Sequence, residues 1–355
     1  MAFETKKIIV VQSLFPALSA TFILDQMIGL INRGFEIENW ATRKSDDKLI
    51  HPAVLKYDLL SKTKYIKVPN KSLITQHQLW LEDFKKINSI SSFDDVFAFH
   101  VHYGNNYNFL EPLFNSINKC VVVSFHGHDA SRAFKIYGDN CYKNLFKRAD
   151  QITTPSYFMK NELVKRGCPD NKINIHRYGI DIQSFSKEKN KFPTNKITFL
   201  TVGRFVEKKG IEYSIKAFAK IKDSVNTEYL IIGEGPRHDI YKKLVKKLGL
   251  EDSVKFLGPK TKEDVLKYMK ASDIFILTSV TAGDGDSEGV PVALTEAQAV
   301  GLPVVSTFHA GIPELVKNNK SGLLSNEKDV TAIASNMLSL ALNERMREEY
   351  SSNAV

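Results

Sequence analysis

The chain has 355 residues, 43% of them hydrophobic and 25% charged, with no low-complexity tract and no repeat of fixed period. A chain of this length is too long to fold around one ordinary hydrophobic core, which indicates a globular protein of two domains. The three cysteines lack Cys-x-x-Cys spacing, so neither a disulfide framework nor a zinc site is indicated, and a reducing cytosol is expected. The first apolar run, Ile8 to Val11, is too short for a signal sequence or a membrane span.

The formal net charge of +9 is unevenly distributed: residues 1–190 contain 26 Lys and Arg against 19 Asp and Glu. A basic first half suits an anionic membrane surface, an acidic acceptor or an ordinary solvated lysine surface. Nucleic acid is not expected as a partner, because no groove-reading motif or basic–aromatic interleaving is present. The membrane hypothesis depends on a lysine run close to apolar residues: Lys56, Lys62, Lys64, Lys67 and Lys71, near Leu73, Ile74 and Trp80.

Apolar runs alternate with amphipathic helical patterns from end to end, which is typical of parallel sheets covered by helices. In the first half, Gly34 is the expected stop of the first helix, and Ser156 is the expected N-cap of a helix that Gly167 ends. Strands are predicted here at 7–12, 35–40, 96–102, 120–125, 151–154 and 172–178, and helices at 22–32 and 157–166.

A polar segment with Pro193, residues 184–195, is predicted to be a linker to a second α/β half. In that half, Thr261 and Asp264 have the spacing of an N-cap pair. Ligands of such sheets bind at the carboxyl ends of strands, so we expect the site in the cleft between the halves. Strands are predicted in the second half at 197–202, 229–233, 254–258, 273–278 and 303–307, with a helix at 211–222.

Two carboxylates, Glu288 and Glu296, stand eight positions apart across a Gly/Pro turn that opens an apolar helix. Pro291 is the expected first residue of that helix, because proline suits a position whose N–H would lack a partner. Glu288 then precedes the helix and Glu296 lies inside it. The N–H groups of Gly289 and Val290 are expected to point out of the helix end, where a phosphate binds well. The segment therefore describes a pocket for a sugar nucleotide.

Basic residues gather where the second half begins. Gly203 closes a strand without a side chain, Arg204 projects from the strand end, and Lys208 and Lys209 precede the next helix. An Arg fork and a Lys point charge converging from a strand end and a helix start form a suitable clamp for a diphosphate. Surface charge on a loop is the alternative for these residues alone. The carboxylate segment in the same half favours the clamp.

His126 lies at the carboxyl end of a hydrophobic strand in the first half, which is the usual place for a site. A neutral imidazole there can hydrogen-bond to sugar hydroxyls or to the transferred centre. Together with His100, His102, His128 and Asp129 it forms a superficial metal cluster, but no open-site triad can be assigned, so a metal is not expected.

Ser19 and Thr21 close the loop between the first strand and the first helix, and its amides are candidates to approach a phosphate or an acceptor hydroxyl. No G-x-G-x-x-G fingerprint occurs in this loop. The run Gly233-Glu-Gly-Pro236 ends a strand of the second half in a similar way and is not that fingerprint either.

These motifs, in this order and spacing, resemble those of the retaining family-four glycosyltransferases, and the resemblance spans essentially the whole chain. It implies the GT-B fold: two Rossmann-like α/β domains facing each other across a cleft, with an acceptor domain at 1–183 and a nucleotide-sugar domain at 196–355. Segments 15–23 and 279–289 further resemble the colanic-acid and amylovoran exopolysaccharide glycosyltransferases, bacterial enzymes that extend a lipid-linked glycan at the cytoplasmic membrane face. The motifs that carry the resemblance are Gly203-Arg204 with Lys209-Gly210, Gly233 to Pro236, Glu288 to Glu296, Phe125 to Asp129 and Tyr178 to Asp181.

The resemblance also implies a role for each matched position. Arg204 and Lys209 bind the donor diphosphate and stabilise charge on the leaving nucleotide. Glu296 holds the ribose hydroxyls, and Glu288 contacts the donor sugar. Further contacts are expected with the sugar from His126, with sugar and phosphate from the amides of Gly289 and Val290, and with the base from backbone near Gly258 and Pro259.

The implied reaction is metal-independent transfer with retention, from a nucleotide sugar expected to be UDP-linked to a glycan or polyprenyl-linked acceptor. No cofactor is expected besides the donor. Same-face transfer with a phosphate oxygen as base fits the lack of an obvious nucleophile, while a covalent intermediate on a carboxylate stays open. The expected location is the cytoplasm, with peripheral binding to the inner face of the cytoplasmic membrane.

Two metal motifs near Glu288 are set aside. Asp284-Gly-Asp286 matches the D-x-D pattern of metal-dependent glycosyltransferases, but that pattern belongs to a different, single-domain architecture. The run from Asp284 also resembles an EF-hand, but its twelfth position is Thr295 and an apolar helix follows, so calcium is not expected.

Two functional alternatives stay open: a nucleotide-sugar epimerase on the same fold, and a non-catalytic glycan- or membrane-binding relative. Consumption of a sugar nucleotide without an acceptor favours the first, and absence of nucleotide binding favours the second. Family members usually continue past a helix such as 332–350 with another that crosses back onto the first domain, whereas this sequence stops at Val355. A truncated form with impaired domain closure is therefore one expectation.

Overall fold

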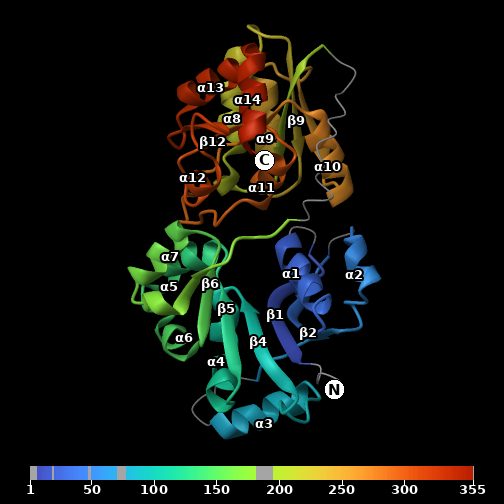
Figure 1. Ribbon diagram of the computed structural model, residues 1–355, viewed down its shortest axis with the longest axis vertical. Helices are drawn as coiled ribbons and strands as arrows, with labels where there is room; N and C mark the ends of the chain where they lie inside the picture. Colours follow the sequence, from blue (N-terminus) through green and yellow to red (C-terminus); the bar gives the residue numbers. More distant parts are fainter. Residues whose placement is uncertain (1–5, 18–19, 47–48, 70–76, 181–194, 355) are drawn as a thin grey trace. The chain divides into compact units, whose positions relative to one another are not determined.

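The computed structural model describes residues 6–17, 20–46, 49–69, 77–180 and 195–354 (Figure 1). The chain divides into two compact units, Met1–Gly179 and Ile180–Val355. The predicted linker lies outside the described residues except for its last position, so its limits stay a prediction.

The described part of the first unit contains a seven-stranded parallel sheet with the order β3-β2-β1-β4-β5-β6-β7. Its strands are β1 (Lys7–Phe15), β2 (Glu36–Lys44), β3 (Thr63–Tyr65), β4 (Val96–His102), β5 (Cys120–Ser124), β6 (Gln151–Thr154) and β7 (Ile173–Ile175). Its helices are α1 (Thr21–Ile31), α2 (Pro52–Lys56), α3 (His77–Ile87), α4 (Gly104–Ser116), α5 (Arg132–Tyr137), α6 (Lys143–Arg148) and α7 (Tyr157–Val164), with 3₁₀ turns η2 (His128–Ala130) and η3 (Asp170–Lys172).

The described part of the second unit contains a six-stranded parallel sheet with the order β10-β9-β8-β11-β12-β13. Its strands are β8 (Ile197–Val202), β9 (Thr227–Ile232), β10 (Val254–Gly258), β11 (Ile274–Leu277), β12 (Val304–Thr307) and β13 (Gly322–Ser325). Its helices are α8 (Ile211–Ile221), α9 (His238–Lys247), α10 (Lys262–Ala271), α11 (Val292–Ala299), α12 (Ile312–Leu315), α13 (Val330–Leu342) and α14 (Glu344–Ala354), with a 3₁₀ turn η5 (Glu207–Lys209).

Helices flank both faces of each sheet (Figure 1), which explains the unbroken apolar runs of the central strands. In β1, Ile9 and Val11 pack into a core with residues of α3, α4, α6 and α7. Ile8 and Val10 pack on the opposite face against α1 and α2, because successive side chains of a strand alternate between faces. Phe199 and Leu200 of β8 divide between the two cores of the second sheet in the same way.

The predicted helix caps are confirmed. The Ser156 hydroxyl accepts the N–H of Met159, and the Thr261 hydroxyl accepts that of Asp264, both at 3.2 Å. Gly34 and Gly167 both have a φ of 86°, the left-handed conformation that commonly follows a helix.

Several element boundaries differ from the prediction. Pro291 has an extended ψ of 115° and caps α11, so the helix begins one residue later, at Val292. The helix expected over 332–350 is two helices, α13 and α14, separated at Asn343. Strands β3 and β13 were not predicted, since each is a sheet edge of only three or four residues with too few positions to show a period.

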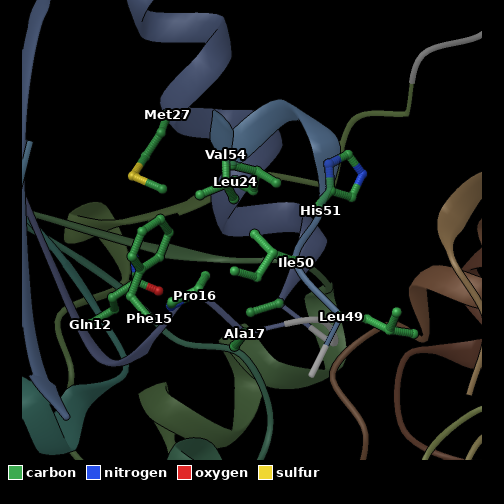
Figure 2. A pocket seen from close by; sticks show the side chains of 11 residues that line it. Gln12, Phe15, Pro16, Ala17, Leu24, Met27, Leu49, Ile50, His51 and Val54 are labelled. Carbon is green, nitrogen blue, oxygen red and sulfur yellow. The ribbon is translucent and has the colours of Figure 1, made fainter. Parts of the chain in front are cut away.

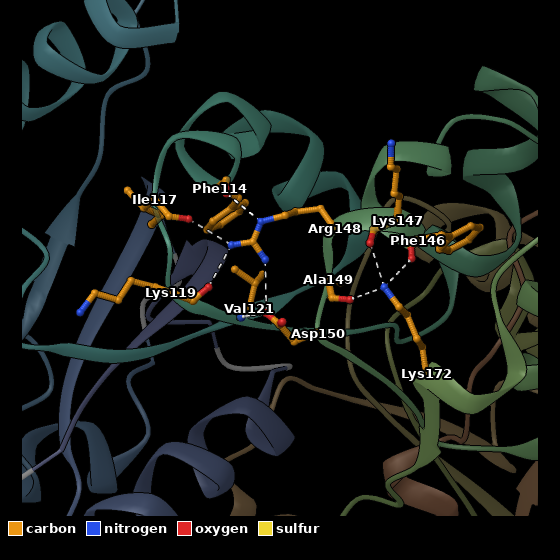
Figure 3. Close-up of polar contacts among 10 residues, drawn as sticks. All are labelled: Phe114, Ile117, Lys119, Val121, Phe146, Lys147, Arg148, Ala149, Asp150 and Lys172. Carbon is orange, nitrogen blue, oxygen red and sulfur yellow. Dashed lines mark hydrogen bonds and ion pairs between the residues drawn. The ribbon is translucent and has the colours of Figure 1, made fainter.

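Two basic side chains of the first unit serve the fold (Figure 3). Lys172 donates at 2.8–3.1 Å to three carbonyls where α6 ends, those of Phe146, Lys147 and Ala149. Arg148 donates at 2.9–3.2 Å to three carbonyls between α4 and β5, those of Phe114, Ile117 and Lys119. Helix-end carbonyls lack partners within the helix and are stabilised by cations. Part of the positive charge of the first half is therefore used inside the fold.

Candidate active site

Several predicted donor residues, Arg204, Lys209 and Glu288 among them, follow β8 or β11, which are neighbours in the second sheet. Strands β8 to β10 follow one another to one side and β11 to β13 to the other, so the winding direction reverses between β8 and β11. Loops that leave a sheet at such a switch point diverge, and ligands bind between them. Lys209 follows β8 and Glu288 follows β11, and Nζ of Lys209 lies 2.8 Å from Oε1 of Glu288.

Glu288 is buried and ionised. Burial by itself raises the pKa of a carboxyl, but the charges of Lys209 and Lys208 outweigh it and lower the pKa of Glu288 to about 2. At neutral pH the side chain can only accept hydrogen bonds. That property suits sugar hydroxyls and excludes a role as general acid.

Three consecutive residues of η5 hold the loop between β11 and α11. The pairs are Glu207 Oε1 with the N–H of Gly283 at 3.0 Å, Lys208 Nζ with Asp286 Oδ1 at 3.0 Å, and Lys209 Nζ with Glu288 Oε1 at 2.8 Å. Asp286, the second carboxylate of the D-x-D pattern, is thus bound to a lysine. Among the described residues, no group of three or more His, Cys, Asp and Glu side chains is arranged to hold a metal ion.

Two glycines of the motifs that carry the family resemblance permit close backbone contact. A side chain at Gly210, whose φ is 61°, would place its Cβ 1.8 Å from the carbonyl oxygen of Thr278. A Cβ at Gly233 would lie 2.0 Å from the carbonyl oxygen of Gly203. These contacts pack the turns after β8, β9 and β11 against one another, because glycine alone fits at such a distance.

The remaining predicted donor residues also belong to the second unit. Arg204 is exposed and forms no ion pair with any residue in the described part of the chain. Glu296 is 8% exposed inside α11. The others are placed as follows: Gly289 is buried, Val290 is half-buried, Gly258 ends β10 with a φ of 69°, and Pro259 is exposed.

The first sheet has its own switch point, between β1 and β4. Thr21 is the first residue of α1, at the end of the loop that follows β1, whereas Ser19 lies outside the described residues. Tyr103 follows β4 with a φ of 69°, and His126 follows β5. The expected histidine and acceptor loop are therefore both at the carboxyl edge of this sheet, where ligands bind.

His126 is held by two hydrogen bonds through its ring. Nε2 lies 3.0 Å from Nδ1 of His102, and Nδ1 lies 2.9 Å from the hydroxyl of Tyr178. Burial and the neighbouring histidines lower the pKa values of His126 and His102 well below the ordinary range. Both imidazoles are therefore neutral at pH 7, as expected for a ring that hydrogen-bonds to a substrate and carries no charge.

Comparison with known proteins addresses the family. The Glycosyltransferase Family 4 model matches residues 19–184, and the Glycosyl transferases group 1 model matches residues 182–355. The amylovoran biosynthesis glycosyltransferase AmsK of Erwinia amylovora is 35% identical over 93% of this chain and 89% of its own. WcaL of Escherichia coli, named for colanic acid biosynthesis, is 34% identical over 90% of this chain and 87% of its own. This chain belongs to their glycosyltransferase family.

The fold of the glycosyltransferase is shared with solved structures at low identity. The structure of Anabaena HepE in complex with UDP and glucose has a TM-score of 0.74 and is 18% identical, with 98% of this chain and 93% of that chain covered. Together with the two parallel sheets, this likeness confirms the predicted GT-B fold class.

Sequence reasoning missed two residues beside Glu288 in the candidate site of the glycosyltransferase, His309 and Glu327. His309 lies two residues after the end of β12, is 1% exposed, and its Nε2 accepts the backbone N–H of Glu288 at 3.1 Å. Its Nδ1 lies 2.6 Å from Oε1 of Glu327. A histidine at the carboxyl end of an apolar strand is the signal that identified His126, and it was available here as well.

A small apolar pocket lies behind the β1–α1 loop of the glycosyltransferase (Figure 2). Phe15, Leu24, Met27, Ile50 and Val54 face into it, and its polar lining comes from Gln12 and His51. Its volume of about 10 Å³ admits one water molecule at most, so neither a sugar nor a lipid fits in this conformation. The pocket is therefore not an acceptor site as it stands.

The structure corrects one residue of the predicted membrane-binding run. Trp80 is 1% exposed and stacks on Phe84 in the core, so it cannot contact a membrane. Lys64 pairs with Glu38 at 3.2 Å, whereas Lys56 is exposed. Three residues of the run lie outside the described residues, namely Lys71, Leu73 and Ile74. No helix in the described ranges has the length and apolar character needed to cross a bilayer.

Proposed function

We propose that this glycosyltransferase is retaining and metal-independent, and moves a sugar from a UDP-sugar to a glycan or polyprenyl-linked acceptor during exopolysaccharide synthesis. The names of AmsK and WcaL support the biosynthetic setting, and the UDP in the HepE structure supports the donor class. The observation that carries the proposal is the ion pair of Lys209 with Glu288 at the switch point of the second sheet.

In this proposal the donor diphosphate binds at the N-terminal end of α11, an eight-residue helix whose first N–H groups lack partners within the helix. Arg204 and Lys209 add positive charge beside it. Negative charge grows on the diphosphate as its bond to the sugar breaks, so fixed cations and amides there stabilise the transition state more than the ground state. Glu296 holds the ribose hydroxyls and Glu288 holds the hydroxyls of the sugar.

Retention follows from attack on the face that the diphosphate leaves. The bond from the anomeric carbon to the diphosphate oxygen breaks, the bond to the acceptor oxygen forms, and the acceptor proton moves to the departing phosphate. Glu288 stays ionised with a pKa of about 2 and is held by Lys209, which makes it a hydrogen-bond acceptor for the sugar. In this proposal neutral His126 hydrogen-bonds to the sugar in exchange for one of its two ring partners, His102 or Tyr178.

We place the enzyme in the cytoplasm, bound peripherally to the inner face of the cytoplasmic membrane through the first domain. Exposed Lys56, Lys62 and Lys67 alternate there with Leu55, which is 63% exposed, and Leu60, which is 38% exposed. Each basic residue near an anionic surface contributes about 1 kcal/mol of binding free energy. This lipid contact places the enzyme beside a polyprenyl-linked acceptor.

The proposal is tested by a screen of sugar nucleotides that measures released nucleoside diphosphate with and without a lipid-linked glycan acceptor. A UDP-sugar is expected to support acceptor-dependent release without added metal and in the presence of a chelator. The anomeric configuration of the product, measured by NMR, is expected to match that of the donor. Inversion, or consumption of the donor without an acceptor, contradicts the proposal, and the latter result indicates an epimerase.

A further inference from the structure

The backbone of Glu288 has a partner of its own, independent of the ion pair of its side chain. The N–H of Glu288 points at Nε2 of His309, 3.1 Å away. His309 comes from the turn after β12, and its side chain is 1% exposed. A backbone N–H in such surroundings is costly to leave without an acceptor. The imidazole therefore determines the position of the Glu288 peptide.

The hydrogen bonds of His309 define its tautomer. A backbone N–H can only donate, so Nε2 of His309 must be without a proton. The one ring proton of the neutral imidazole is then on Nδ1, which donates to Oε1 of Glu327 at 2.6 Å. A carboxylate that accepts from one ring nitrogen of a histidine selects the tautomer and orients the ring.

Glu327 also holds the other end of the same loop. Its Oε2 accepts the N–H of Thr281 at 2.9 Å. One carboxylate is thus bonded directly to Thr281 and, through His309, to Glu288. His309 and Glu327 therefore connect the turns after β12 and β13 with both ends of the loop between β11 and α11.

We propose that His309 is a positioning residue for transfer: as the Nδ1–H tautomer set by Glu327, it fixes the Glu288 peptide so that the carboxylate meets the donor sugar. This inference rests on the proposed role of Glu288 and adds the group that holds it. A small displacement of a group that orients a substrate can cost about a hundredfold in rate. His309 touches neither donor nor acceptor in this scheme.

Two substitutions of similar size each remove a different one of the two hydrogen bonds of His309. In His309→Gln the amide oxygen reaches the position of Nε2 and can accept the Glu288 N–H, while the contact with Glu327 is lost. In His309→Asn the amide reaches the position of Nδ1 and can bond Glu327, while Glu288 loses its acceptor. We expect His309→Gln to keep turnover within about threefold of the parental rate and His309→Asn to lose about a hundredfold in kcat. Equal losses in both variants, or parental kcat in a folded His309→Asn, overturn the proposal.

A second measurement needs no donor. Long-range proton–nitrogen NMR spectra of the ligand-free protein report the tautomer of each histidine, and the signal that vanishes in His309→Gln belongs to His309. The expected pattern is a protonated Nδ1 and a bare Nε2, and a protonated Nε2 contradicts the inference. If the parental chain turns over no sugar nucleotide, the proposed function fails, and this spectrum still decides whether His309 accepts the Glu288 N–H.

Discussion

Nζ of Lys209 lies 2.8 Å from Oε1 of Glu288, and their side chains are 13% and 8% exposed. The resemblance assigned Lys209 to the diphosphate and Glu288 to the sugar, and the structure places their charged groups in contact. The pair joins the turn after β8 to the loop after β11 at the reversal of the sheet. A donor bound there meets a cation and a carboxylate that already hold each other in place.

Removing one member of this pair is expected to destabilise the second domain. Lys209→Met leaves an ionised carboxylate buried without its partner, which costs about 3 kcal/mol of the free energy of unfolding. Urea denaturation at pH 7 measures the loss. The double variant Lys209→Met/Glu288→Gln is the control and is expected to recover most of the stability, since no buried charge remains. A single variant as stable as the parental protein contradicts a buried pair.

The same pair predicts a pH dependence. The pKa of Glu288 is lowered from an ordinary 4.5 to about 2 in the folded protein. A carboxyl with a depressed folded pKa contributes stability that is present above its unfolded pKa and lost as the pH falls through the folded pKa. The free energy of unfolding, relative to the Lys209→Met/Glu288→Gln variant, should therefore fall by about 3 kcal/mol between pH 4.5 and about pH 2. A difference that is constant over this window contradicts the shift.

Substitution of Arg204 is expected to lower the rate of transfer without lowering the stability of the protein. Its side chain is exposed and makes no ion pair with the described residues, so Arg204→Ala should change the free energy of unfolding by less than about 0.5 kcal/mol. Loss of a cation beside the leaving diphosphate should lower kcat by about a hundredfold. Thermal denaturation and nucleoside diphosphate release measure the two effects. Parental kcat in Arg204→Ala would remove this residue from the site.

Substitution of Lys172 is expected to lower the stability of the protein without lowering its turnover. Lys172→Met leaves three carbonyls near the end of α6 without their donor and should cost about 1–3 kcal/mol of the free energy of unfolding. Turnover measured well below the new melting temperature should stay at the parental level, because the side chain serves the fold of the first domain. Lys160→Met is the control, because Nζ of Lys160 pairs with the exposed carboxylate of Asp170. A loss of stability in Lys172→Met that is absent from Lys160→Met supports the assignment.

The membrane hypothesis predicts salt-sensitive binding. The protein should co-sediment with vesicles that contain anionic lipid at low salt, and the double variant Lys56→Gln/Lys67→Gln should bind with a free energy weaker by about 2 kcal/mol. Lys172→Met is a matched control, because its ammonium faces carbonyls of its own domain. Equal binding by neutral and anionic vesicles, or no sedimentation at all, rules the proposed surface out.

The fold was predictable where periodic patterns were long. The central strands β4 and β8 begin and end at the predicted residues, because apolar runs bounded by turn residues mark strands in the interior of a sheet. The caps at Ser156 and Thr261 were equally clear, since their chemistry is local. The short edge strands β3 and β13 were missed, because three or four residues are too few to show a period.

The residues of the candidate site were proposed from the sequence, but the contacts between them could not be predicted. Spacing identified Glu288 and Lys209, yet their ion pair depends on the order of strands in the sheet, which one sequence does not show. His309 and Glu327 are eighteen residues apart and belong to different turns, so their bond appears only in the folded chain. Trp80 was wrongly assigned to a membrane surface because it follows the lysine run in the sequence, whereas it packs in the core.

The most direct test compares Glu288→Gln with the parental enzyme at saturating donor. Release of nucleoside diphosphate is measured with the UDP-sugar that the parental chain uses best, and binding of UDP alone is measured by calorimetry. Glu288→Gln should keep the affinity for UDP within about threefold, because UDP lacks the sugar, and should lose about a hundredfold in kcat. Parental kcat in a folded Glu288→Gln variant would contradict the assignment of this carboxylate to the transferred sugar.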